Sequence, residues 1–258
     1  MNTRIFREAT PWGELHLSLS SDDPPVVRLI LEGTFLMDSE SVASETALAR
    51  EGLRLWAKSG AGRSSHQHRT LIGGLGLGLT LRALLDAMAL SRASRGRQEV
   101  VVAELFEPLV AWNQGPLAPL NGRALSDPRV DCVMGDLAQL LREIPGSEAP
   151  LGRRFDLMLL DTDNGPTWLS RPENAWLYGQ EGVAAITDWL RPGGVVVFWA
   201  TEISEAFAAT LETAAVRING EWGLQQIEAK PRRRQLVPPD VLYWLRCPPG
   251  DGPETDSA

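Results

Sequence analysis

The first forty residues alternate apolar and polar positions in short runs separated by turn-forming residues. The run Glu14–Leu19 alternates in this way, Ser20–Pro25 interrupts it with acids and prolines, and Val26–Leu31 resumes the apolar character. A period of two places successive side chains on opposite faces of a strand, and clusters of Ser, Asp and Pro mark turns. The pattern therefore predicts a small N-terminal β unit, a hairpin, over residues 1–38.

From residue 41 to residue 58 the apolar positions recur at helical spacing, and a regular alternation of strands and helices follows a glycine-rich loop. The predicted strands are 70–72, 100–103, 130–133, 156–160 and 195–199, the predicted helices are 79–90, 108–113, 137–142, 179–190 and 205–215, and 223–227 with 241–245 close the chain as an antiparallel pair. Such alternation is typical of an α/β, doubly wound, mostly parallel sheet. This domain is expected to span residues 39–246, and residues 247–258, rich in Pro, Gly and acids, to be a disordered tail.

Composition narrows the classes of partner. The 258 residues carry 25 Lys and Arg against 33 Asp and Glu, a formal charge of −8, which disfavours nucleic acid; the basic run 230–234 is assigned to a solvated turn. The N-terminus is charged and no apolar run approaches the ~18 residues of a membrane span, so neither export nor a membrane is expected. Cys132 and Cys247 lack disulfide or zinc spacing, which fits a reducing, cytoplasmic compartment.

The segment Leu71–Gly78 runs from a predicted strand through a turn with four glycines into a predicted helix. These glycines are Gly73, Gly74, Gly76 and Gly78. Glycine allows the backbone to approach a ligand closely, and the start of the following helix offers free N–H groups. The turn predicts a nucleotide-type site, although tight packing of a strand against a helix explains such glycines too.

Acidic residues follow the next three predicted strands. Glu104 ends the second strand, Asp136 follows the third, and Asp161 follows the fourth with Asp163 in the same loop. In doubly wound sheets ligands bind at the carboxyl ends of the strands, and an acid after the second strand accepts hydrogen bonds from ribose hydroxyls. Asp136 could accept the exocyclic amine of adenine. The series predicts a site for an adenosine-bearing cofactor.

In the order of these motifs the chain resembles the spermidine synthase branch of the class I S-adenosylmethionine-dependent methyltransferase superfamily. The matching segments are Leu71–Arg82, Val101–Glu107, Asp127–Val130, Gly135–Asp136, the Asp161 loop and Leu190–Gly194. The resemblance implies a Rossmann-like fold after a small β unit, S-adenosylmethionine or a close relative as cofactor, and a possible homodimer. It also implies that Glu104 with Leu105 holds the ribose, that Asp136 with Leu137 holds the adenine, and that Asp161 lies beside the sulfonium.

The chain departs from the aminopropyltransferases of this branch at three places. Their Gly-Gly-Gly-Asp-Gly-Gly turn holds the amine of the decarboxylated cofactor, whereas this turn contains Leu75 and Leu77 and no acid, which favours intact S-adenosylmethionine. In place of their Asp-Ser-x-Asp-Pro-x-Gly-Pro loop, this chain has a shorter loop, residues 161–166, with Asn164 before Gly-Pro. Of their Tyr-x-Glu segment, this chain keeps only the acid, Glu45. Glu45 is either an exposed helix carboxylate or a substrate-binding group.

Aromatic residues follow this loop at Trp168, Trp176 and Tyr178. They either form walls for a flat or cationic acceptor or pack a lid onto the sheet. The sequence shows no third metal ligand near the pair His66 and His68, so we expect a loop there and no metal site.

The expected activity is transfer of an alkyl group, most simply methyl, from S-adenosylmethionine to a small-molecule nucleophile. Asp161 and Asp163 are the expected catalytic residues, as base or orienting groups. Glu45, Asn164, Trp168 and Tyr178 are expected to bind the acceptor. The alternatives are aminopropyl transfer from the decarboxylated cofactor to a diamine, and a non-catalytic nucleoside-binding protein that keeps the fold.

Overall fold

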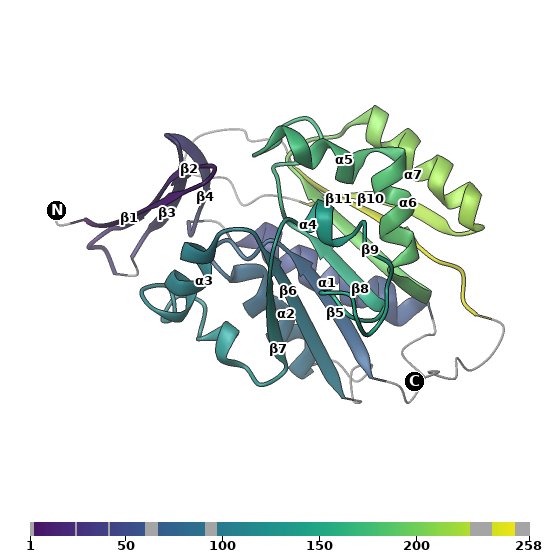
Figure 1. The fold of residues 1–258 in the computed structure, drawn as a ribbon, viewed down its shortest axis with the longest axis horizontal. Coiled ribbons are helices and arrows are strands. Elements are labelled where there is room, and N and C mark those ends of the chain that lie inside the picture. The colour runs from purple at the N-terminus through teal and green to yellow at the C-terminus, as the bar shows by residue number, and fades with distance from the viewer. Residues whose placement is uncertain are drawn as a thin grey trace.

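The computed structural model describes residues 3–23, 25–40, 42–59, 67–90, 97–227 and 239–250. Two sheets organise these residues (Figure 1), one of four strands in the order β1-β2-β3-β4 and one of seven in the order β10-β11-β9-β8-β5-β6-β7. The loop expected at His66 and the solvated turn expected for the basic run 230–234 lie outside the described residues. The remaining predictions can be compared with the structure.

The N-terminal unit is a four-stranded antiparallel sheet. Its strands are β1 (Arg4–Thr10), β2 (Gly13–Leu19), β3 (Val27–Leu31) and β4 (Thr34–Asp38). The predicted hairpin is its central pair, and the prediction missed the two outer strands. β1 is mostly exposed, with Phe6 as its one apolar side chain packed against the core, so it has no apolar alternation. The turn before β4 is formed by Glu32 and Gly33, both at positive φ. One face of the sheet packs through Leu17 and Leu29 against Leu109 and Trp112 of α3 (Glu107–Gln114).

The seven-stranded sheet confirms the predicted doubly wound, mostly parallel architecture. Its strands are β5 (His68–Gly73), β6 (Gln98–Glu104), β7 (Val130–Met134), β8 (Phe155–Leu160), β9 (Leu190–Ala200), β10 (Glu221–Ile227) and β11 (Asp240–Arg246). The strands β7, β6, β5, β8 and β9 pair in parallel, whereas β11 pairs antiparallel with β9 and with β10. The predicted closing antiparallel pair is also confirmed.

Helices cover both faces of this sheet (Figure 1). On one face lie α1 (Ala43–Lys58) and α2 (Leu79–Leu90), and on the other lie α4 (Leu137–Leu140), α5 (Ala175–Tyr178), α6 (Gln180–Asp188) and α7 (Glu205–Ile218). In β8, Leu157 and Leu159 pack against the first layer, and Met158 and Leu160 pack in the second. A strand buried on both faces is apolar throughout, which is why the sequence predicts it clearly.

Two predicted boundaries are wrong. The helix predicted over 179–190 ends at Asp188, and Pro192–Gly194 lies inside β9 because the chain bulges there, with Gly193 at φ +73°. The tail predicted from Cys247 is anchored at its start, since the amide of Cys247 donates to the Gly194 carbonyl (2.9 Å) and Pro248 accepts from Gly193 (2.8 Å). Residues 251–258 lie outside the described part of the chain.

A buried carboxylate ties three strands together at the edge of the sheet opposite the glycine turn. Asp156, which is 1% exposed, accepts hydrogen bonds from the Arg69 amide (2.8 Å) and from the Arg191 guanidinium (3.2 Å). These residues come from β8, β5 and β9. Removing one partner of a buried ion pair leaves an uncompensated charge.

We therefore predict that Asp156→Ala lowers the free energy of unfolding by about 3–5 kcal/mol, because it strips the buried Arg191 of this counter-charge. Urea denaturation of the full chain measures the change. Asp131→Ala, on the exposed part of β7, is the matched control and should shift the value by no more than about 0.5 kcal/mol. Equal denaturation midpoints for Asp156→Ala and the unaltered chain would contradict the prediction.

Candidate functional site

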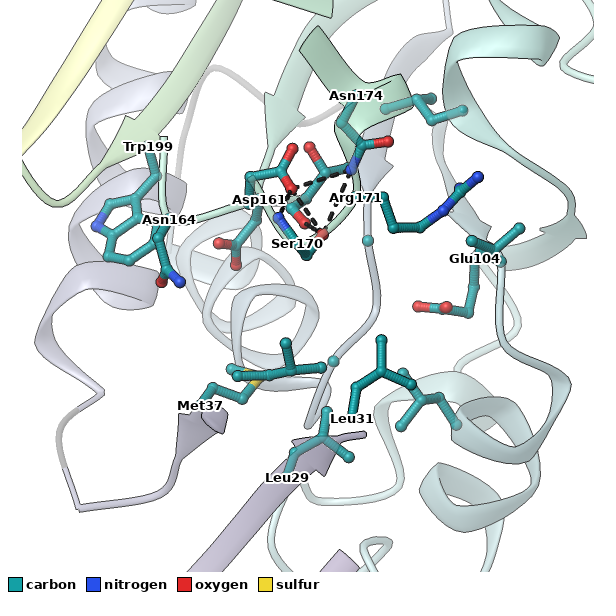
Figure 2. Close-up of a pocket in the computed structure, with 18 of the residues that line it drawn as sticks. Leu29, Leu31, Met37, Glu104, Asp161, Asn164, Ser170, Arg171, Asn174 and Trp199 are labelled. Atoms are coloured by element: carbon teal, nitrogen blue, oxygen red, sulfur yellow. Dashed lines mark hydrogen bonds between the residues drawn. The ribbon is translucent and has the colours of Figure 1, made fainter. Parts of the chain in front are cut away.

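A pocket of about 520 Å³ lies at the carboxyl ends of β5, β6 and β8, between the two sheets (Figure 2). Of the residues predicted for the site, those that line it are Glu45, Gly74, Gly76, Glu104, Leu105, Asp136, Leu137, Asp161, Asp163, Asn164 and Trp168. Gly73, Gly78 and Tyr178 do not line it. Its volume lies within the 300–1,000 Å³ typical of small-molecule sites.

The glycine turn forms one wall of the pocket. Gly74, Gly76 and Gly78 have φ values of +91°, +51° and +77°, which residues with side chains rarely adopt. A Cβ on Gly74 would lie 2.6 Å from the Asp161 carbonyl oxygen, and one on Gly78 would lie 2.4 Å from the Asn113 side-chain oxygen. The same glycines therefore allow tight packing beneath the turn and an open backbone above it.

The leucines of the turn point away from the pocket. Leu75 packs in the core beneath α1 and α2, and Leu77 packs against the N-terminal sheet. The fourth residue of the turn, at which the aminopropyltransferases have their aspartate, is Gly76, and a Cβ there would lie 2.7 Å from the Met37 sulfur. The turn thus presents bare backbone and no acid to the pocket.

Glu104 braces the glycine turn. Its carboxylate, 4% exposed, accepts hydrogen bonds from the amides of Leu75 (2.8 Å) and Phe106 (2.7 Å). Burial raises the pKa of Glu104, while these backbone donors lower it in part. Glu104 also lines the pocket, so its carboxylate borders the space that a ligand would occupy.

Asp136 is engaged on both of its oxygens. Oδ1 caps α4 by accepting from the amides of Ala138 (2.8 Å) and Gln139 (3.3 Å), and Oδ2 pairs with the Arg171 guanidinium (2.8 Å). The acid predicted to face adenine is therefore also the acid that positions a basic side chain of the following loop. The sequence prediction included no role for Arg171.

Three carboxylates face one another at the opposite end of the pocket. Asp161 is held by Thr80, whose hydroxyl donates to Oδ2 (2.7 Å), and burial and the charge of Asp240 raise the pKa of Asp161. Glu45 has its pKa raised to about 7 by burial first and by Asp161 and Asp240 in addition. Like charges that share a desolvated site retain protons more strongly than isolated acids do.

Glu45 is not an exposed helix carboxylate. It is 7% exposed, lines the pocket, and accepts a hydrogen bond from Ser44 (2.8 Å) in the first turn of α1. The interpretation of Glu45 as a surface acid is therefore wrong, and the position predicted for it beside the acceptor agrees with its place in the pocket.

Asp163 organises the loop that closes the pocket. Its carboxylate accepts from the Ser170 amide (2.7 Å) and hydroxyl (2.6 Å), from Asn174 (3.0 Å) and from the Tyr178 hydroxyl (3.4 Å). With so many donors committed to it, Asp163 is suited to holding residues 162–178 rather than to accepting a proton. Its predicted catalytic role gains no support from this geometry.

Of the aromatic residues after the loop, one lines the pocket and the others pack elsewhere. Trp168 lines the pocket with 56% of its surface exposed, whereas Tyr178 lies in an aromatic cluster with Phe198 and Phe207. Trp176 packs beneath the Arg142 guanidinium, 4.0 Å from the ring centroid. Tyr178 therefore does not contact the pocket as predicted, and the packing interpretation holds for it.

Sequence reasoning missed several residues that line the pocket. These are Trp199 and Thr201 at the end of β9, Asp240 at the start of β11, Arg171 in the loop, and Leu29, Leu31 and Met37 of the N-terminal sheet. The sequence could have indicated Trp199 and Thr201, because residues at the carboxyl ends of parallel strands gather at one edge of the sheet. Asp240 begins an antiparallel strand, where that rule does not apply.

Within the described residues, no group of three or more His, Cys, Asp or Glu side chains is arranged to hold a metal ion. His68 is buried and shares a hydrogen bond with the Thr70 hydroxyl (2.9 Å). In the same part of the chain, every helix is too short or too polar to cross a membrane.

The seven-stranded sheet, its two helical layers and the pocket at the strand ends define a doubly wound, Rossmann-like fold. Solved structures of this type match the chain. They are spermidine synthase from Thermotoga maritima (16% identity over 94% of this chain and 72% of that one, TM-score 0.63), spermidine synthase with the transition-state analogue AdoDATO (15%, 94% and 72%, 0.65), and MnmC2 from Aquifex aeolicus (14%, 95% and 73%, 0.53).

These similarities confirm the spermidine synthase-like fold, including the N-terminal sheet. At such low identity they establish the fold alone. No protein-family model and no curated protein sequence matches the chain.

We predict that the buried Glu45 makes stability fall as pH rises. Its pKa is about 7 in the folded chain against an ordinary 4.5, so the folded chain binds more protons between these values and the free energy of unfolding decreases through this window. The loss is on the order of 3 kcal/mol and complete above pH ~7. Glu45→Gln should remove it.

Urea denaturation at intervals from pH 4.5 to pH 8 measures the difference in unfolding free energy between Glu45→Gln and the unaltered chain. That difference should grow with pH in favour of the variant. Glu212→Gln, on the exposed side of α7, should give a difference that does not change with pH. A flat difference for Glu45→Gln as well would disprove the assignment of the raised pKa.

Proposed function

We propose that this protein transfers an alkyl group, most simply methyl, from S-adenosylmethionine to a small amine. One observation carries the proposal: a single pocket places the bare backbone of the glycine turn and Glu104 at one side and the carboxylates of Glu45, Asp161 and Asp240 at the other. The first group suits a nucleoside, and the second suits a cation.

The geometry of the residues that line the pocket supports a site for such a cofactor. Gly74 and Gly76 line the pocket in conformations that leave their backbone open, and the carboxylate of Glu104, held by the Leu75 amide, lines it beside them. The fold similarity to spermidine synthases adds to this fit, since one of those structures contains an adenosyl transition-state analogue. When bound, the cofactor supplies a positively charged sulfonium whose carbon accepts a nucleophile as the carbon–sulfur bond breaks and leaves a neutral thioether.

The acidic end of the pocket selects the acceptor. Carboxylates that are desolvated together are stabilised by a cation between them, and an ammonium group meets this need. An ammonium must lose a proton before its nitrogen can attack, and a carboxylate with a raised pKa takes that proton more readily. Asp161, oriented by Thr80 and adjacent to the glycine turn through its own backbone, is the best-placed base.

The apolar side of the pocket excludes water from the transfer. Leu29, Leu31 and Met37 of the N-terminal sheet line it opposite the acids (Figure 2). A dry site strengthens the interaction of the carboxylates with an ammonium and prevents hydrolysis of a reactive donor. The N-terminal sheet is therefore part of the proposed active site.

Aminopropyl transfer from the decarboxylated cofactor is the second candidate, and the charge of the pocket favours it. Arg171 is the one basic side chain among the described residues that line the pocket, and it is paired with Asp136, so none of these residues offers a free cation near Asp161 to the carboxylate of intact S-adenosylmethionine. The glycine turn argues against aminopropyl transfer, because Gly76 offers no counter-charge to an aminopropyl ammonium. Methyl transfer remains the first proposal on that ground.

Titration calorimetry of the purified full chain separates the two candidates. We expect intact S-adenosylmethionine to bind at least tenfold more tightly than its decarboxylated form, since the turn lacks the acid that would hold the free amine. Tighter binding of the decarboxylated form would replace methyl transfer by aminopropyl transfer.

Asp161→Asn tests the proposed base. The amide keeps the shape of the side chain and its bond from Thr80 but takes no proton, so kcat should fall by about 10²–10⁴ while the Kd for S-adenosylmethionine stays within about threefold. The assay follows label from methyl-labelled cofactor into a panel of small amines and diamines. Asp131→Asn is the control, and an unchanged kcat in Asp161→Asn would exclude Asp161 as the base.

A further inference from the structure

Arg171 lies at the end of the pocket away from the acids. Among the described residues that line the pocket it is the only basic side chain, and 13% of it is exposed. Figure 2 shows its side chain extending toward the side of Glu104 and away from Asp161. Nothing in the proposed transfer step uses this guanidinium, so it calls for a separate explanation.

The guanidinium is fixed from several sides. Nη1 donates to Asp136 (2.8 Å), Nη2 lies 3.5 Å from Glu173, and the group sits 5.2 Å from the ring centroid of Trp12. Trp12 belongs to the turn between β1 and β2 and also packs edge-on against Phe106, two residues after Glu104, with 5.5 Å between the ring centroids. The loop, the large sheet and the N-terminal sheet therefore meet at this one side chain.

One donor of this guanidinium is unused. Arg171 Nε is buried and has no hydrogen-bond partner among the described residues. A buried donor without a partner costs about 1–3 kcal/mol, so its retention at a pocket points to a ligand acceptor. Beside it, Asp136 has accepted three hydrogen bonds of the roughly four that a carboxylate can take.

The pair Asp136 and Arg171 thus offers one acceptor next to one donor. The edge of adenine has the complementary pattern, because its exocyclic amine donates and the ring nitrogens on either side of it, N1 and N7, accept. Hypoxanthine, with an oxygen in place of the amine, presents an acceptor to the carboxylate and is mismatched. A site built to hydrogen-bond a group rejects an analogue that lacks it strongly.

We propose that Arg171 is the residue that specifies adenine in this pocket, by donating Nε–H to N1 or N7 while Asp136 accepts the exocyclic amine. This inference rests on the proposed function only in requiring an adenine nucleoside as ligand. It assigns the specificity to the loop after β8 and, through Trp12, to the N-terminal sheet.

Binding of S-adenosylhomocysteine, its inosine counterpart and its 1-deaza and 7-deaza counterparts to the full chain tests the assignment by calorimetry. The unaltered chain should bind the adenine compound at least tenfold more tightly than the inosine compound and than one of the two deaza compounds. Arg171→Lys keeps a charge for Asp136 but loses the fixed donor, so the adenine compound and the two deaza compounds should then bind within about threefold of one another. The inosine compound should still bind more weakly, because Asp136 is unchanged.

Arg142→Lys is the matched control, since Arg142 packs on Trp176 outside the pocket and should leave the discrimination unchanged. Thermal unfolding of Arg171→Lys within about 2 °C of the unaltered chain shows that the fold persists. Binding of the adenine compound by Arg171→Lys with undiminished affinity, and with the same discrimination against the deaza compound, would overturn the inference and leave the proposed transfer standing. Failure of the unaltered chain to bind any of the compounds would overturn both, whereas adenine discrimination without any transfer would overturn the proposed function alone.

Discussion

The turn after β5 can follow its path only because Gly74, Gly76 and Gly78 carry no side chains. Beneath it, Asn113 donates to the Gly76 carbonyl (2.9 Å) and Asn121 contacts Asn113 (2.6 Å), so the backbone is held from below by buried amides. Glu104 holds it from the side. The rest of the site depends on this close approach, because it sets how near the Asp161 loop can lie to the turn and therefore where the pocket opens.

Two kinds of buried acid occur in this fold, and their surroundings separate them. Asp156 lies at the far edge of the sheet beside two arginines, and its charge is compensated within the protein. Glu45 and Asp161 face each other and Asp240 with their pKa values raised, and Arg171, the one basic side chain among the described residues that line the pocket, lies at the other end. Carboxylates gathered in a cavity are costly to desolvate together, which is the physical reason to assign them to a ligand and not to stability.

The sequence predicts well those parts whose burial is reflected in the local pattern. The strand Phe155–Leu160 is apolar throughout because both its faces are covered, and the acids after successive parallel strands meet at one edge of the sheet as expected. The sequence does not predict β1 because the strand is mostly exposed and packs only Phe6 against the core. Proximity in sequence to the loop predicts Tyr178 in the site, yet its ring packs in the core. Asp240 reaches the pocket through an antiparallel pairing, which no local pattern encodes.

The N-terminal sheet links these features. Its apolar residues Leu29, Leu31 and Met37 form the wall of the pocket that faces the acids, and desolvation is the largest cause of the raised pKa of both Glu45 and Asp161. In the proposed transfer, the wall that would exclude water from the sulfonium is therefore also a source of the basicity of the group proposed to take the proton. A chain with the same acids but without this sheet would leave them hydrated, with pKa values nearer the ordinary range and a weaker hold on an ammonium. The proposal thus gives the small sheet a chemical role in the site as well as a structural one.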